Sequence, residues 1–89
     1  MREKTEKETF IDFLSDRWKT WDEKTETNGD TIISKDFIKN KEDFYIIARF
    51  SKSGNFCGLG WLLNGSGEAI INGGGFSFDD FCDFLRMIL

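Results

Sequence analysis

The chain has 89 residues, which is enough for one domain with a single modest core. Its net charge is −4, from 12 Lys and Arg against 16 Asp and Glu, so it lacks the excess of cations that neutralises nucleic-acid phosphates. No run of about 18 apolar residues is present to span a bilayer, and no apolar stretch follows the charged first residues. We therefore expect a soluble, cytoplasmic protein in which residues 1–89 form one domain, with no direct contact to nucleic acid or membrane.

The residue types needed for catalysis or metal binding are scarce. The sequence contains no histidine, and its two cysteines, Cys57 and Cys82, lie outside any Cys-x-x-Cys spacing. The neighbouring carboxylates Asp79 and Asp80 would point about 100° apart on a helix, so they cannot serve as acid and base on one substrate. We expect no enzymatic activity, no catalytic residue, no metal and no cofactor. We expect both cysteines to be small, buried hydrophobic residues.

The first part of the chain predicts one amphipathic helix. Residues 1–8 form a polar leader, and Thr9 with Asp12 gives a partial capping pattern. Apolar side chains then recur at intervals of three and four residues, which predicts a helix over residues 10–24. These side chains are Phe10, Ile11, Phe13, Leu14, Trp18 and Trp21.

The middle of the chain predicts strands joined by short turns. Residues 31–34 and 37–38 favour a short, irregular strand, and alternation of apolar residues predicts strands over 44–51 and 56–63, followed by 68–72. Short loops between neighbouring strands favour antiparallel pairing in sequence order. The predicted fold class is α+β, an antiparallel meander of three to four strands with an N-terminal helix and a C-terminal helix.

The end of the chain predicts the second helix, over residues 78–89. Ser77 and Asp80 have the spacing of a capping box, and Phe76 and Phe81 occupy the two positions of a hydrophobic staple. The helix is apolar on nearly every side. One side must pack on the sheet, and either the first helix or a second chain must cover the other, so a homodimer through this helix is one alternative.

Seven of the nine glycines lie within residues 57–78, which raises the question of a phosphate-binding loop. A dinucleotide-binding pattern is incomplete because Leu63 stands where the third glycine is required. A Walker pattern is incomplete because Ser66 stands where the phosphate-binding lysine is required. Neither match is followed by a predicted helix, so we reject both motifs.

A structural interpretation explains these glycines better. Gly58 and Gly60 leave one face of a predicted strand bare, so that a Trp or Phe from a helix can pack against the backbone. Gly65 and Gly67 supply positive φ angles in a hairpin turn. Gly73–Gly75 give a bent entry to the last helix, and one alternative stays open there, since three bare amides before a helix can hold an anion.

The order of elements resembles that of the small acidic α+β inhibitors made by phages and mobile elements, anti-CRISPR proteins among them. The resemblance covers a short leading helix, the meander FYIIARFSKSGNFCGLGWLLNGSGEAII and the terminal helix FSFDDFCDFLRMIL. It implies a stoichiometric inhibitor that binds a host nuclease or its recognition surface and has no catalytic activity.

The function that these patterns favour is non-enzymatic protein binding, as an inhibitor or adaptor. Aromatic side chains anchor protein interfaces and charges at the rim steer the approach, and a basic host protein suits an acidic chain as partner. Two alternatives remain: a homodimeric structural protein, and a small-ligand binder that uses the bare strand face at Gly58 and Gly60. The alternative for both tryptophans is that their rings close the core. The candidate contact residues are Trp18, Trp21, Asp22, Glu23 and Glu26.

Overall fold

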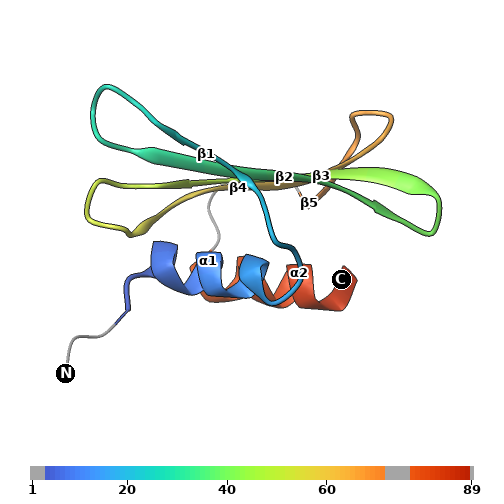
Figure 1. Ribbon diagram of the computed structural model, residues 1–89, viewed down its shortest axis with the longest axis horizontal. Helices are drawn as coiled ribbons and strands as arrows, with labels where there is room; N and C mark the ends of the chain where they lie inside the picture. Colours follow the sequence, from blue (N-terminus) through green and yellow to red (C-terminus); the bar gives the residue numbers. More distant parts are fainter. Residues whose placement is uncertain (1–3, 72–76, 89) are drawn as a thin grey trace.

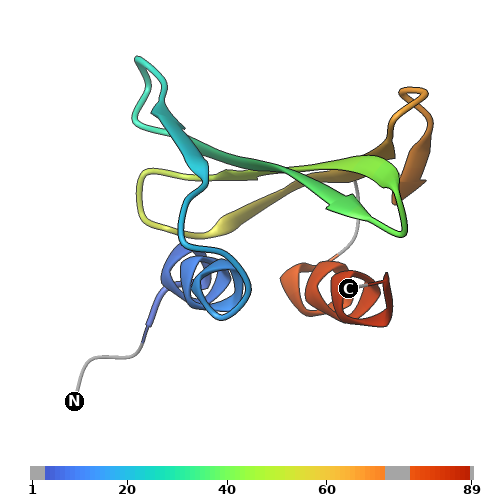
Figure 2. The same ribbon diagram turned by 45° about the vertical axis from the view of Figure 1, so that its right-hand side comes forward.

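The computed structural model describes residues 4–71 and 77–88. Five strands pair in sequence order to form one antiparallel sheet, and both helices lie side by side on the same face of it (Figure 1, Figure 2). The predicted α+β fold is confirmed, with five strands in place of three to four. Neither described helix is long and apolar enough to cross a membrane. The elements are α1 (Glu6–Ser15), β1 (Asp22–Thr25), β2 (Thr31–Lys39), β3 (Glu42–Phe50), β4 (Phe56–Asn64), β5 (Ala69–Ile71) and α2 (Phe78–Ile88).

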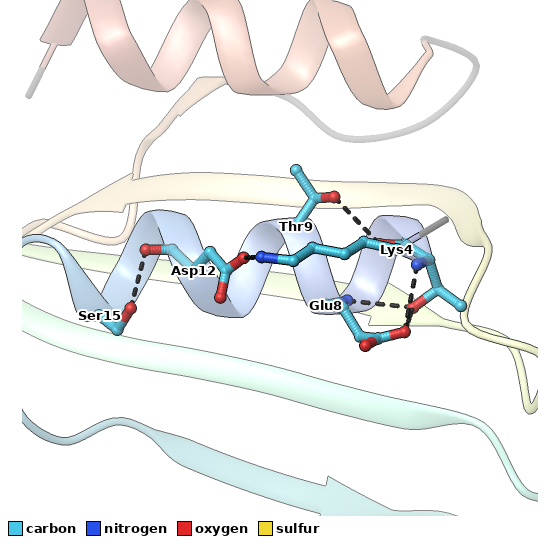
Figure 3. A network of polar contacts seen from close by, with 6 residues as sticks. Lys4, Glu8, Thr9, Asp12 and Ser15 are labelled. Atoms are coloured by element: carbon cyan, nitrogen blue, oxygen red, sulfur yellow. Dashed lines mark hydrogen bonds and ion pairs between the residues drawn. The ribbon is translucent and has the colours of Figure 1, made fainter. Parts of the chain in front are cut away.

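Helix α1 begins before the apolar pattern predicts, because Thr5 caps it. The Thr5 hydroxyl accepts a hydrogen bond from the Glu8 amide at 3.1 Å, and the Glu8 carboxylate accepts one from the Thr5 amide at 3.2 Å. Figure 3 shows this capping box, which satisfies two amides that the helix itself cannot pair. The predicted polar leader is therefore wrong from Thr5 onwards. Thr9, predicted as the cap, lies inside the helix and donates its hydroxyl to the Thr5 carbonyl.

Helix α1 also ends early, at Ser15, so the predicted helix over residues 10–24 is wrong in its second half. The amides of Arg17 and Trp18 both donate to the Leu14 carbonyl, at 3.0 and 2.8 Å, and close the last turn. The chain then leaves the helix axis and crosses to the sheet (Figure 2).

Strand β1 lies where the sequence predicts the end of that helix, and it supplies the fifth strand. The Trp18 ring packs on Phe37 of β2, with 5.0 Å between ring centroids. Residues 22–25 then pair with β2, Asp22 opposite Ser34. These contacts with distant parts of the chain outweigh a helical spacing that had no other support, as tertiary packing commonly does.

Strand β2 is one continuous strand of nine residues, longer than the short, irregular strand that residues 31–34 and 37–38 predict. It joins β3 through Asn40 and Lys41, whose φ angles are 54° and 65°. Two residues at positive φ form the type I′ turn that matches the twist of a hairpin. The turn fixes the register of β2 on β3 along its full length.

Alternation along the strands sorts their side chains between two faces of the sheet. Ile33, Ala48 and Gly60 are neighbours across the sheet, are buried, and face the helices. Ile47 and Trp61, one residue away on their strands and paired with each other, face the opposite side. The buried core comprises Phe10, Phe13, Leu14, Ile33, Phe37, Ile46, Ala48, Phe50, Leu62, Phe78, Phe81, Cys82 and Leu85.

The glycine at position 60 admits a helix side chain to the sheet, as the sequence predicts. A Cβ at Gly60 would lie 2.8 Å from two atoms of the Phe81 ring of α2. Phe81 in turn stacks on Phe56 of β4, with 5.3 Å between centroids and 13° between planes. Gly58 has a different role, because its φ angle is 74° and it lies where the β3–β4 register shifts.

The β4–β5 turn is organised by Asn64. Its side-chain oxygen accepts hydrogen bonds from the amides of Ser66 and Glu68, both at 3.0 Å. Gly67 has a φ angle of 80°, as predicted, but Gly65 is not at positive φ, so the prediction for Gly65 is wrong. The glycines of both rejected phosphate motifs thus lie in β4 and this hairpin turn, away from the start of any described helix.

Helix α2 begins with the predicted cap, since the Asp80 amide donates to the Ser77 hydroxyl at 3.2 Å. Phe76 and Gly73–Gly75 lie outside the described residues, and so does the predicted anion-binding alternative. Helix α1 lies beside α2 and contributes Phe10, whose ring centroid lies 5.9 Å from that of Phe81. The first helix therefore covers part of α2, one of the two arrangements that the sequence left open.

Candidate functional site

The two tryptophans predicted as contact residues lie on the helix side of the molecule. Trp18 is half-buried between Phe37 and the ammonium group of Lys35, which lies 5.9 Å from its ring centroid. Trp21 is also half-buried and packs against the core. Both rings pack against the edge of the core. This is the alternative to a contact role that the sequence analysis left open for the two tryptophans.

The three acidic residues predicted beside them do not gather into one surface. Asp22 and Glu23 are exposed on β1, and as consecutive strand residues they point to opposite faces of the sheet. Glu26 is half-buried in the β1–β2 turn, where its amide donates to the Asp30 carbonyl at 2.7 Å. Only Asp22, opposite Ser34, belongs to the face that points away from the helices.

That face, the open face of the sheet, is the surface that sequence reasoning missed. No described helix or strand covers it, as Figure 1 and Figure 2 show. Its centre is apolar, because Ile47 is paired with Trp61 and Tyr45 with Leu63 across β3 and β4. We define the open-face patch as Ile32, Tyr45, Ile47, Leu59, Trp61 and Leu63. Leu59 is 38 % exposed, and the other five side chains of the patch are half-buried.

Charged groups surround the open-face patch. Arg49 of β3 donates to the Asp30 carboxylate at 3.0 Å, and the side chains of this ion pair are 31 % and 20 % exposed. An open hollow of about 450 Å³ lies at the β2–β3 hairpin. The hollow is lined by Asp36, Phe37, Ile38, Asp43 and Phe44.

A second apolar area lies on α2. Phe84 is 44 % exposed and Met87 is 82 % exposed, on the side of the helix away from the sheet. These are two residues on one helix, whereas the open-face patch draws side chains from three neighbouring strands.

The two cysteines differ in environment, and the expectation that both are buried is wrong for Cys57. Both thiols are free, Cys82 is buried on α2, and Cys57 is exposed on β4. Burial raises the pKa of the Cys82 thiol to about 11, which keeps it protonated at neutral pH. Partial desolvation and the nearby Asp30 carboxylate raise the pKa of Cys57. Within residues 4–71 and 77–88, no three His, Cys, Asp or Glu side chains lie close enough together to hold a metal ion.

The chain matches no protein-family model, no curated protein and no solved structure.

Proposed function

We propose that the protein acts by binding another protein without catalysis, as an inhibitor or adaptor, and that the open face of its sheet is the contact surface. The observation that carries this proposal is the open-face patch, which presents aromatic and apolar side chains that no described element covers. Aromatic anchors such as Trp61 and Tyr45, surrounded by charge, are the usual anatomy of a protein interface. A small-ligand site at Gly60 is less well supported, because the Phe81 ring fills the space beside that glycine.

The resemblance in element order to anti-CRISPR and related phage inhibitors supports an inhibitor over an adaptor. It makes host nucleases the first targets to test. A target in solution would meet side chains from three neighbouring strands, which suits contact with a protein better than contact with a metabolite.

A double variant of the open face tests the proposal. Ile47→Thr with Trp61→Thr removes the apolar centre while keeping residues that favour strands. Loss of one central aromatic anchor typically costs about 2 kcal/mol or more, so we expect target affinity to fall at least about 30-fold. The matched control, Phe84→Asp with Met87→Asp on α2, should bind its target as the unmodified protein does. Target capture that is unchanged in the open-face variant contradicts the proposal.

The exposed residues of α2 favour one second candidate, a homodimeric structural protein joined through this helix. Phe84 and Met87 would then be buried between two copies. Molecular mass in solution decides between the two candidates. A dimer that the α2 control variant converts to a monomer supports the second, and a monomer for both proteins supports the first.

A further inference from the structure

Acidic side chains outnumber basic ones on the open face. Arg49, the arginine on this face, is bonded to Asp30 and is therefore neutralised locally. Strand alternation and register place four more charged side chains on the face, three acidic and one basic, and none of them forms an ion pair with another described residue. They are Asp22, Lys24, Asp36 and Asp43.

Two of these aspartates lie next to Tyr45 of the open-face patch. Asp36 is directly opposite Tyr45 in the β2–β3 register, and Asp43 lies two residues before Tyr45 on the same side of β3. Both line the hollow near the hairpin, together with Ile38, which is 72 % exposed and opposite Asp43. Asp36 and Asp43 thus share one face of the hairpin with the exposed apolar side chain of Ile38.

We propose that the open face docks a protein segment carrying an arginine, with its guanidinium between Asp36 and Asp43 and an adjoining apolar side chain on the open-face patch. This inference rests on the proposed function and specifies its partner. A guanidinium is planar, weakly hydrated and able to bond two carboxylate oxygens at once, while its three-carbon stem packs on apolar surface such as Ile38. A compact, strongly hydrated lysine ammonium fits such a site less well.

A second copy of this chain is a poorer occupant of the same face. Its open face carries the same surplus of aspartates, so pairing the two would bring like charges together. The arginine that it offers there, Arg49, is already bonded to Asp30. The charges therefore favour a different, basic partner.

The probe for the test is a library of random twelve-residue peptides selected for binding to the full chain. We expect the selected peptides to contain an arginine beside aromatic or aliphatic residues. Replacing that arginine with citrulline, which has the same shape without the charge, should weaken binding about tenfold or more. Asp36→Asn with Asp43→Asn should weaken the arginine peptide equally and leave the citrulline peptide unchanged.

Two variants separate failure of this inference from failure of the proposed function. The control Asp79→Asn with Asp80→Asn removes the same charge from α2, on the helix side, and should leave peptide affinity within about twofold. If citrulline peptides bind as tightly as arginine peptides but lose affinity for the Ile47→Thr/Trp61→Thr protein, the proposed arginine site is wrong. The proposal that the open face is the contact surface is then still supported. If the selection yields no peptide whose affinity depends on the open face, both are wrong.

Discussion

Replacing Gly60 with alanine tests whether the bare backbone of β4 serves to admit the Phe81 ring. A Cβ at this position would lie 2.8 Å from two atoms of that ring and 3.1 Å from the Phe56 ring. Phe81 is fully buried, with the rings of Phe56 and Phe10 only 5.3 and 5.9 Å away between centroids, so it has little room to move. Overpacking a core in this way costs about 1 to 3 kcal/mol, and we expect Gly60→Ala to lower the free energy of unfolding by that amount.

Urea unfolding measures this effect, and the chain offers a matched control. At a slope of about 1 kcal/mol per M, typical of a small domain, the midpoint should fall by roughly 1 M or more. Gly65 is not at positive φ, and a Cβ there would meet its nearest neighbour, the Asp43 Cβ, at 3.4 Å, an ordinary contact. Gly65→Ala should therefore change stability by less than about 0.5 kcal/mol. If Gly60→Ala is as stable as Gly65→Ala, the packing role assigned to Gly60 is refuted.

Four further predictions concern the cap, the cysteines and the open face. Thr5→Ala should lower the free energy of unfolding by about 1 kcal/mol because it removes the capping box, whereas Thr9→Ala should change it by less than about 0.5 kcal/mol, and equal losses would contradict the assigned cap. Alkylation followed by mass spectrometry should label Cys57 before Cys82, because the first thiol is exposed and the second is buried. Below pH 9 the Cys82 thiol is protonated in the folded and unfolded chains alike. Between pH 9 and about 11 only the unfolded chain loses this proton, so stability should fall by roughly 2 to 3 kcal/mol as pH rises, and Cys82→Ala should remove that part of the slope. Trp61→Thr should lower the free energy of unfolding, measured in urea, by about 1 kcal/mol or less, because no described element covers the Trp61 ring. A loss of several kcal/mol would show that the ring is part of the core.

The sequence predicts those elements whose signals are local. Strands β3 and β4 are largely apolar runs between polar turns, which gives their bounds within two residues, and the cap at Ser77 starts α2 correctly. Gly60 was also predictable, because a glycine between large residues on one strand face leaves room that some ring must fill.

The sequence misleads where distant contacts decide. Trp18 and Trp21 continue the three- and four-residue spacing of α1, but the packing of Trp18 on Phe37 and the pairing of Asp22 with Ser34 end the helix. Neither contact is visible in a local pattern. The true start of the helix was visible, because Thr5 is followed three residues later by a glutamate, the full capping box.

The open face was only half predictable for a similar reason. Alternation already placed Tyr45 and Ile47 on the opposite side of their strand from Ile46 and Ala48. Both sides of the strand are apolar, however, and the sequence does not say which side the helices cover. Two helices on one side leave the other side bare, and this depends on the path of the whole chain.

The indole N–H signals of the three tryptophans in a ¹H–¹⁵N NMR spectrum show whether the open face of the sheet is the contact surface. Trp61 reports on the open face, whereas Trp18 and Trp21 report on the helix side where sequence alone placed the contact. On titration with a target or a selected peptide, we expect the Trp61 signal to shift or broaden and the other two signals to stay in place. Movement of the Trp18 and Trp21 signals with an unchanged Trp61 signal would contradict binding through the open face.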